Sequence, residues 1–236
     1  MTRTPLTRWI LAVPALVATA ALAACGSDDS ASSGDNPSGT GGASCTYTKS
    51  GTAAKPVDLP PSEAAATGDV PVTLHTSIGD LGLTLDGADA PCTVNSFISL
   101  AKQGYYDGTS CHRLGDTAGF QLLQCGDPTG SGSGGPGYSY DDELSGSPIT
   151  DTDAQSTTYP AGTLAMANSG PNTNGSQFFM VFGDTRLGPA YTVFGTLDAD
   201  AIQKLVKVGK AGNDGAWGDG TGRPKTPVTF DSVDVG

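Results

Sequence analysis

Groups that could bind a ligand are concentrated in residues 164–183, which read LAMANSGPNTNGSQFFMVFG. The middle of this stretch is dense in Asn, Gly and Pro, which favour turns and loops. The run 177–182 that follows is largely aromatic and apolar, a composition that suits a half-buried strand. The sequence therefore predicts a polar loop that presents side-chain and backbone amides beside an aromatic strand. A plain connection between two strands is the alternative.

A second stretch combines a cation with an amide. Arg113 follows His112, and Gln124 comes a few residues later, each within two residues of a cysteine. Arginine is permanently charged and presents its N–H donors as a rigid fork, so Arg113 is one candidate for a group that binds a ligand. An arginine in a structural ion pair is the alternative. No metal site is expected, because the chain has no CxxC pair and its only histidine near a cysteine is adjacent to it.

Composition narrows the fold class and the partners. The chain has 236 residues, of which 34 are Gly and 16 are Pro, and hydrophobic residues make up 37%. These values favour a turn-rich β-protein with some disordered segments over a helical bundle. The formal net charge is −12. An acidic surface repels phosphate backbones, so nucleic acid is not expected as a partner.

Residues 1–24 have the features of a lipoprotein signal peptide, which is removed and takes no part in the fold. Arg3 and Arg8 make the start positive, and the apolar run 9–22 is too short and Ala-rich for a good membrane span. The run ends in Leu-Ala-Ala-Cys, which is similar to a bacterial lipobox and predicts lipidation of Cys25. Several acyl chains give stable anchoring, so the expected location is extracytoplasmic and lipid-anchored to the cell membrane. An ordinary secretory signal, with the cysteine incidental, is the alternative.

Residues 25–68 are expected to form a flexible tether between this anchor and a folded domain at 69–236. Ser, Gly, Asp, Asn and Thr dominate the range 27–44, which has almost nothing to bury. The Pro-rich run 55–61 is expected to be stiffer and close to polyproline II. A free thiol in a linker is a liability, so Cys45 is expected to be bridged to the domain.

Four cysteines remain once Cys25 is assigned to lipid, namely Cys45, Cys92, Cys111 and Cys125. An even number of cysteines outside the cytoplasm suggests disulfides. Four cysteines allow three connectivities, and the spacing alone does not choose among them.

Short strands and two helices are expected in residues 69–236. Alternating residues over 70–75 and 81–85 predict a β-hairpin. Pro91 opens a helix whose apolar residues recur at helical spacing, and a second amphipathic helix is expected over 199–208. Many short strands with two helices of this length predict a mainly β protein, with a closed barrel capped at its ends.

Both chemical stretches resemble, in residue type and order, those of the cyclophilins, the peptidyl-prolyl cis-trans isomerases. The resemblance covers about 69–236 and, with the lipobox, suggests a bacterial lipoprotein form. It implies a closed eight-stranded antiparallel cyclophilin-like barrel. It also implies an isomerase that needs no cofactor and acts, as a monomer, on Pro-containing segments of unfolded or exported proteins.

The implied reaction is rotation about an X–Pro peptide bond, which amide resonance opposes with a barrier of roughly 18–20 kcal/mol. An enzyme accelerates this rotation by binding the twisted amide more tightly than the planar one. A twisted prolyl nitrogen regains its lone pair and can accept a hydrogen bond from a guanidinium. The resemblance therefore implies that Arg113 is the catalytic residue.

Further site positions follow from the resemblance, one residue at a time. The residues implied to bind substrate are His112, Gln121, Leu122, Gln124, Ala167, Asn168, Gln177, Phe179, Leu187 and Tyr191. Among them, Phe179 matches the aromatic floor of the proline pocket and Leu187 its aliphatic wall. Leu122 stands where members often have Met, and Tyr191 where many have His.

Two positions depart from the family pattern. Gln121 falls where the family usually has Phe, so part of the apolar pocket is missing unless the longer loop at 115–119 moves Phe120 into it. On this ground the alternative function is a weakly active or inactive module that binds Pro-containing peptides as a holdase or interaction module. Arg186 falls where many eukaryotic members have the Trp that supports cyclosporin binding, so cyclosporin is expected to bind weakly.

The resemblance also bears on the disulfides. If the strands around Arg113 pair as they do in the family, Cys111 and Cys125 lie opposite or nearly so, and a cross-strand disulfide is possible. Cys45 is then left to pair with Cys92.

Overall fold

A computed structural model describes residues 42–145 and 155–236 of the chain. The expected signal peptide at 1–24, the expected lipidation site Cys25 and most of the range 27–44 lie outside the described residues. Within the described ranges, no helix is long and apolar enough to cross a membrane.

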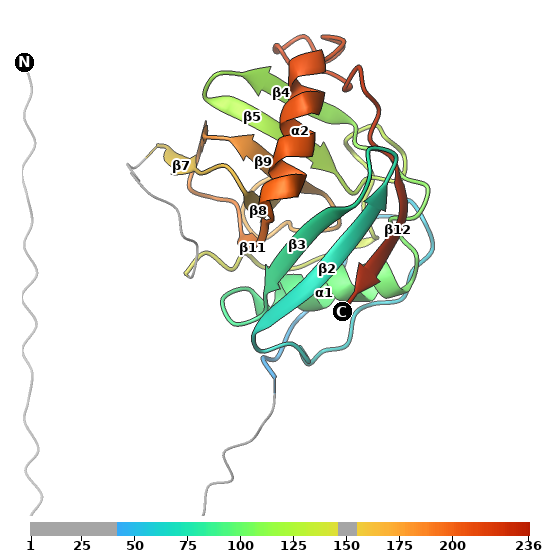
Figure 1. The fold of residues 1–236 in the computed structure, drawn as a ribbon. Helices are drawn as coiled ribbons and strands as arrows, with labels where there is room; N and C mark the ends of the chain where they lie inside the picture. The colour runs from blue at the N-terminus through green and yellow to red at the C-terminus, as the bar shows by residue number, and fades with distance from the viewer. Residues whose placement is uncertain (1–41, 146–154) are drawn as a thin grey trace, which may run out of the picture. The chain divides into compact units, whose positions relative to one another are not determined.

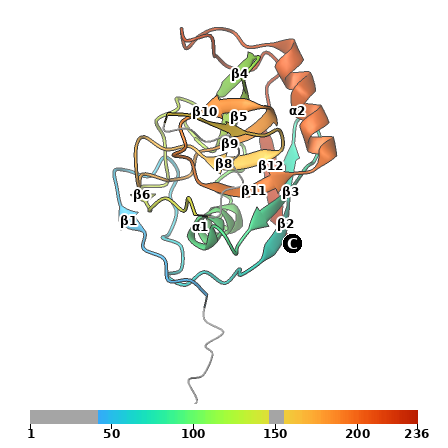
Figure 2. The ribbon, with the colours of Figure 1, turned by 90° about the vertical axis from the view of Figure 1, so that its left-hand side faces the viewer.

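Eight strands form one antiparallel sheet that curls around a hydrophobic core (Figures 1 and 2). In sheet order they are β12 (Phe230–Val235), β2 (Asp69–Thr76), β3 (Leu81–Asp86), β11 (Val193–Leu197), β8 (Thr163–Met166), β9 (Phe178–Gly183), β5 (Phe120–Cys125) and β4 (Arg113–Thr117). Next to its two edge strands, isolated bridges join Ser110 with Thr229 and Leu114 with Gly222, and no continuous ladder links β4 to β12. The prediction of a mainly β, eight-stranded antiparallel fold is confirmed, in the form of a curled sheet whose two ends are linked by these bridges.

Alternation along the strands separates the barrel core from a second apolar cluster. In β9, Phe178 has no exposed surface and lies in the barrel core, whereas Phe179 belongs to the second cluster. The Phe178 ring lies 5.5 Å from that of Phe97 and 6.1 Å from that of Phe230, measured between ring centroids. The aromatic core therefore fixes the strand whose other face carries the candidate site.

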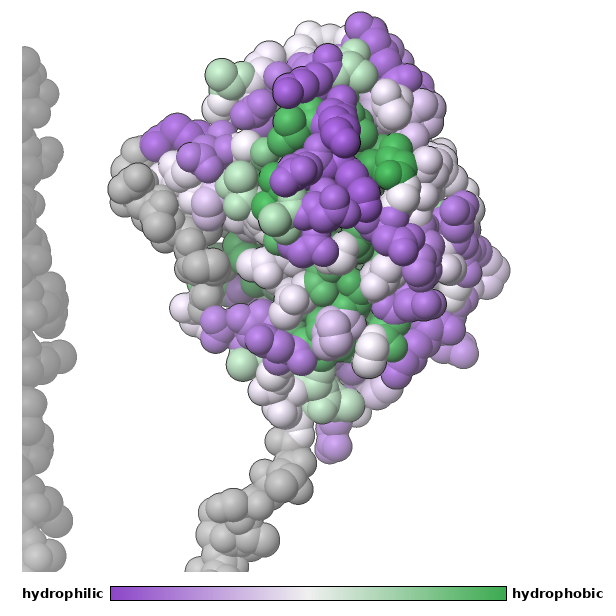
Figure 3. All heavy atoms as spheres, viewed as in Figure 1, coloured by the Kyte–Doolittle hydropathy of each residue, from purple (hydrophilic) through white to green (hydrophobic). Residues whose placement is uncertain are grey.

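Two helices pack against the sheet, as predicted (Figures 1 and 2). α1 (Pro91–Lys102) begins with Pro, where the missing N–H is harmless, and contacts β12 and β3. α2 (Ala199–Ala211) is capped by Asp198, whose carboxylate accepts a hydrogen bond from the backbone N–H of Ala201. It contacts β9, β3 and β4. Hydrophilic residues gather over α2 in Figure 3, with hydrophobic residues beside them, as an amphipathic helix requires.

The segment 42–68, called the N-terminal strap below, is ordered against the domain. Within it β1 (Thr48–Lys49) pairs with β6 (Tyr138–Ser139), and the Tyr47 hydroxyl donates to the Cys92 carbonyl at 2.7 Å. The strap belongs to one compact unit that begins at Thr40. The expected domain start at 69, and the flexible tether over 42–68, are therefore corrected. A ladder, a partly buried tyrosine contact and a disulfide hold the strap, and the small and polar residues that dominate its composition did not reveal this.

Both disulfides pair as the resemblance implied. Cys45 joins Cys92, with Cα atoms 5.4 Å apart, and so fastens the strap to the start of α1. Cys111 joins Cys125, with Cα atoms 4.1 Å apart, and so links the segment just before β4 to the last residue of β5, next to the pair of Arg113 and Gln124.

The segment expected to be a longer loop at 115–119 is mostly strand. β4 pairs with β5 residue by residue, from Arg113 opposite Gln124 to Thr117 opposite Phe120. The turn is tight, and Gly119 makes it with a φ of 81°, a conformation that glycine adopts at little cost. The extra residues therefore lengthen the hairpin and not the loop.

Candidate active site

Arg113 is the first residue of β4, and its side chain is 28% exposed. Its Nε donates to Oγ1 of Thr221 at 2.9 Å, and its Nη2 donates to Oδ2 of Asp219 at 2.7 Å. Its Cζ lies 5.8 Å from the ring centroid of Phe120 and 5.8 Å from that of Trp217, within the range of cation–π attraction. Two hydrogen bonds and two aromatic rings therefore hold this guanidinium in place.

The second apolar cluster, called the groove cluster below, includes the predicted proline-pocket residues. Its buried members are Leu122, Tyr159, Ala165, Phe179, Val181 and Val193, with Phe120, Ala167, Leu187 and Tyr191 partly buried against them. Leu187 comes from β10 (Thr185–Leu187), which pairs with β7 (Thr157–Tyr159). Tyr191 meets Phe179 edge-on, with ring centroids 5.5 Å apart. The structure thus brings Leu122, Phe179, Leu187 and Tyr191 together in one cluster of apolar and aromatic side chains, in which Leu187 and Tyr191 remain partly exposed.

Phe120, and not Gln121, completes the groove cluster. The ladder between β5 and β9 shifts register between Gln121 and Leu122, so the two strands are bulged there. The Phe120 ring lies over Gly115, where a Cβ would overlap it, and within 5.8 Å of the Arg113 Cζ. Gln121 instead places its side-chain amide against Gly183, and its backbone N–H donates to Thr185. The assignment of Gln121 to the substrate pocket is therefore corrected in favour of its neighbour.

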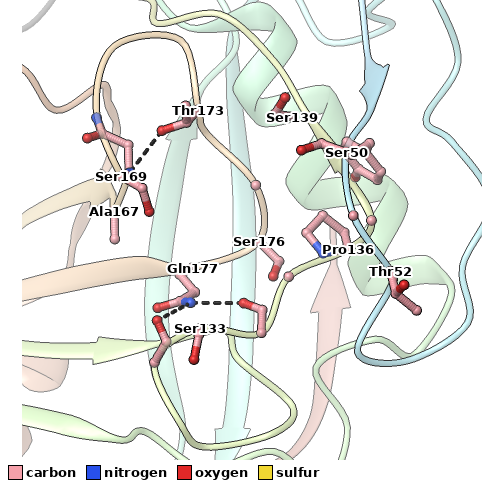
Figure 4. A pocket seen from close by; sticks show the side chains of 18 of the residues that line it. Ser50, Thr52, Ser133, Pro136, Ser139, Ala167, Ser169, Thr173, Ser176 and Gln177 are labelled. Carbon is pink, nitrogen blue, oxygen red and sulfur yellow. Dashed lines mark hydrogen bonds between the residues drawn. The ribbon is translucent and has the colours of Figure 1, made fainter.

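Two glutamines hold each other in fixed positions beside the groove cluster. Nε2 of Gln124 donates to Oε1 of Gln177 at 2.8 Å. Nε2 of Gln177 in turn donates to the carbonyls of Gly132 and Gly134, at 3.0 and 2.9 Å (Figure 4). The backbone carbonyl of Gln177 accepts from the N–H of Ala167 at 2.9 Å. The amide groups expected to bind a peptide backbone are thus organised before any ligand is present.

A cleft of about 520 Å³ opens beside these amides. The predicted residues that line it are Gln124, Ala167, Asn168 and Gln177. Residues 50–52 of the N-terminal strap form part of its wall, and Figure 4 shows Ser50 and Thr52 on the same side of the cleft as Pro136 and Ser139. The strap's contribution is not foreseen by the sequence analysis, which assigned these residues to a tether.

His112 lies beneath this surface and not in it. It is 1% exposed, and its ring is tilted against Trp217 at a centroid distance of 6.2 Å. Burial lowers the pKa of His112, so the imidazole stays neutral at neutral pH. The structure therefore supports packing behind Arg113 for His112, and not the substrate contact that the resemblance implied.

The family of the chain follows from the match of its sequence to a family model. The family described as cyclophilin type peptidyl-prolyl cis-trans isomerase/CLD matches residues 71–235 of the chain. The chain belongs to the cyclophilin family. The resemblance stated from its two chemical stretches is confirmed.

Mycobacterial proteins are among the relatives of this cyclophilin. The probable peptidyl-prolyl cis-trans isomerase B of Mycobacterium tuberculosis is 49% identical over 203 residues, which cover 84% of this chain and 65% of that protein. The cyclophilin described here thus spans about 65% of the length of that relative. Peptidyl-prolyl cis-trans isomerase A of the same species is 39% identical over 180 residues, which cover 69% of this chain and 90% of that protein.

A solved structure shares the fold of this cyclophilin. The cyclophilin type peptidyl-prolyl cis-trans isomerase of Cryptosporidium parvum has 30% sequence identity and a TM-score of 0.58, covering 71% of this chain and 98% of its own. A second crystal structure of that protein, obtained in the presence of the dipeptide Ala-Pro, has 29% identity and a TM-score of 0.56, with 70% of this chain and 98% of that chain covered.

Sequence reasoning missed the three residues of this cyclophilin that hold Arg113 from outside the hairpin. Asp219, Thr221 and Trp217 lie in the Gly-rich stretch between α2 and β12, which the sequence suggests only as a loop. A single Trp and two aspartates among glycines are the only sequence signal that this loop does more than connect two elements.

Proposed function

We propose that this cyclophilin catalyses cis–trans isomerisation of X–Pro bonds. The observation that carries the proposal is the Arg113 guanidinium held 5.8 Å from Phe120, at the edge of the groove cluster. A substrate proline seated on that cluster would bring its amide within reach of the guanidinium. The description of the family to which the chain belongs, cyclophilin type peptidyl-prolyl cis-trans isomerase/CLD, supports the same activity.

The groups of the site have separate roles in the proposed reaction. The rings of Phe179, Phe120 and Tyr191 bury the proline ring, and the amides of Gln124 and Gln177 bind the flanking backbone. Arg113 then donates to the prolyl nitrogen, which becomes a better acceptor as the amide twists out of plane. Because these groups are already held in place, little reorganisation opposes the stabilisation of the twisted amide.

Isomerase kinetics on a proline tetrapeptide test this function. With the compact unit of residues 40–236, we expect a rate well above the uncatalysed one. Arg113→Lys keeps the charge but loses the rigid fork, so kcat/KM should fall by about a hundredfold, as for loss of one oriented donor. A wild-type rate equal to the uncatalysed rate would overturn the proposal.

We further propose that the protein acts outside the cytoplasm on Pro-containing segments of exported proteins, anchored by lipid on Cys25. Two disulfides in the described residues support this, because such bonds persist in oxidising compartments. The lipobox-like Leu-Ala-Ala-Cys run at 22–25 supports the anchor. Mass spectrometry of the membrane fraction should find an acylated N-terminal Cys25, and Cys25→Ser should release the protein. Equal membrane retention of that variant would contradict lipid anchoring.

A second candidate function is a peptide-binding module with little turnover. Its original support, Gln121 at the position of the family Phe, is weakened by Phe120 in the groove cluster. One observation still favours this second function. Arg113 already forms an ion pair with Asp219, which weakens its positive field toward a substrate. Binding of a proline tetrapeptide without turnover would select this function.

Weak cyclosporin binding is also part of the proposal. Arg186 is exposed on β10 and its Nη2 donates to the Ser156 hydroxyl. An inhibition titration of the isomerase rate measures this affinity, and potent inhibition would refute the expectation.

A further inference from the structure

The loop of residues 212–222, called the clamp loop below, connects α2 with the segment before β12 and makes three contacts with the side chain of Arg113. Asp219 and Thr221 accept its two hydrogen bonds, and the Trp217 ring lies 5.8 Å from its Cζ. None of these residues belongs to the β4–β5 hairpin that carries Arg113. The clamp loop is therefore a separate element that determines where the guanidinium sits.

The hydrogen bonds between the loop and Arg113 form a closed ring through Asp219 and Thr221. The Thr221 hydroxyl donates to Oδ1 of Asp219 and accepts from Nε of Arg113, which uses its single proton once. Oδ2 of Asp219 accepts from Nη2 at 2.7 Å. The guanidinium thus presents its Nε–Nη2 edge to the loop. Its Nη1 end has no hydrogen-bond partner among the described residues, and it is the end left to donate to a substrate.

The clamp loop is itself held rigid. Oδ1 of Asp214 accepts from the backbone N–H groups of Ala216 and Arg223, at 3.0 and 2.8 Å, and these bonds lower the pKa of Asp214. The N–H of Leu114, next to Arg113, donates to the Gly222 carbonyl at 2.7 Å. The loop therefore closes on the strand that holds Arg113, and a Cβ at Gly222 would overlap the Asp214 carboxylate.

We propose that Asp219 and Thr221 are positioning residues that aim Arg113 at the prolyl amide, and that Trp217 closes the site over the guanidinium. This inference rests on the proposed isomerase function. A long arginine side chain loses much conformational freedom when it is fixed, and the clamp loop fixes it before substrate binds. The Thr221 hydroxyl pins Asp219, because the side chain and backbone N–H of Thr221 both donate to Oδ1.

The test compares Asp219→Ala, Asp219→Asn, Thr221→Val and Thr221→Ser in residues 40–236. Misplacement of a catalytic group by about 1 Å can cost a hundredfold, so Asp219→Ala and Thr221→Val should lower kcat between about tenfold and a hundredfold with KM nearly unchanged. Thr221→Ser keeps the hydroxyl and should rescue activity. Asp219→Asn keeps an acceptor without the charge and should retain more activity than Asp219→Ala. Asp231→Asn removes an exposed carboxylate from β12 and serves as the charge control.

Two spectroscopic readouts test the positioning itself, whether or not the protein is an isomerase. Trp217 is the only tryptophan in residues 40–236, so its fluorescence reports on the site alone. The Nε–H resonance of Arg113 should shift in Thr221→Val and return toward its wild-type position in Thr221→Ser. Thermal unfolding of each variant controls for loss of the fold.

The outcomes separate the inference from the function on which it rests. An inactive wild type with a shifted Arg113 resonance in Thr221→Val would refute the isomerase function but not the clamp. A fully active Asp219→Ala and Thr221→Val pair would overturn the inference. Higher activity of Asp219→Ala would also overturn it, because the carboxylate would then withhold Arg113 from substrate and not aim it.

Discussion

Phe120 and Gln121 are neighbours in the chain, yet only Phe120 packs in the groove cluster. The bulge between β5 and β9 and the bare backbone of Gly115 decide this, since the ring needs the space where a Cβ would stand. Alignment by residue type alone picked Gln121, because sequence spacing does not show a register shift. From the sequence, Phe120 could be predicted to fill this part of the pocket only as an alternative, and the structure supports that alternative.

Single substitutions at this pair should therefore have unequal effects. Phe120→Ala removes an aromatic wall of the groove and should lower kcat/KM by roughly tenfold, the equivalent of about 1.4 kcal/mol. Gln121→Ala leaves the groove cluster unchanged and should alter kcat/KM less than about twofold. Isomerase kinetics on the two variants measure this difference. Equal losses would mean that Gln121 contacts the substrate after all.

The two histidines should couple stability to pH in opposite directions. Burial has the largest effect and lowers the pKa of His112. The nearby Asp127 carboxylate raises this pKa, whereas the charges of Arg113 and Arg223 lower it. Its unfolded pKa is about 6.5, so the unfolded state takes up the proton first and stability falls as pH drops below about 6.5. Hydrogen bonds with Asp80 and then Asp234 raise the pKa of His75. The stability that His75 contributes to the folded state is fully present below about pH 6.5, and it is lost as the pH rises through the folded pKa.

Urea unfolding of the wild type, His112→Gln and His75→Gln between about pH 5 and pH 8 separates the two effects. His112→Gln should remove a loss of stability on the acid side. His75→Gln should remove a loss that occurs as the pH is raised. Identical pH profiles for all three proteins would contradict both assignments.

At the scale of elements, the order of the N-terminal strap and the contacts of the clamp loop with Arg113 are the features that the sequence did not indicate. Small and turn-forming residues dominate both segments, as they do in disordered or connecting segments. Their order comes from distant partners, Cys92 and Tyr138 for the strap and Arg113 and Leu114 for the clamp loop. Local composition carries no information on such contacts. The hairpin and helices were predictable because their periodicity records burial directly.

Removing the strap's disulfide should loosen it without unfolding the barrel. Cys45 and Cys92 are 47 residues apart, and closing a loop of that length corresponds to about 4 kcal/mol in the chain-entropy account. The double variant Cys45→Ala, Cys92→Ala should unfold at lower denaturant and be cleaved first within 42–68 by a protease. Cleavage at the same rate as in the wild type would show that the β1–β6 ladder alone holds the strap.

At the scale of the whole molecule, the barrel brings together residues that are far apart in the sequence. Arg113 and Asp219 are 106 positions apart, and Gln124 and Gln177 are 53 apart. The fold class, the catalytic candidate and most of the groove followed from two stretches of sequence and the family resemblance. The outer contacts of the site did not, because only closure of the barrel brings the clamp loop against β4.

The most direct test of the account is the ratio of kcat/KM between the wild type and Arg113→Ala, measured on a proline tetrapeptide with residues 40–236. Loss of one oriented donor predicts a fall of about a hundredfold to a thousandfold, while Trp217 fluorescence still reports peptide binding. Lys207→Ala, an exposed cation of α2, should leave the ratio near one. An Arg113→Ala variant as active as the wild type would contradict the claim that this guanidinium drives the reaction.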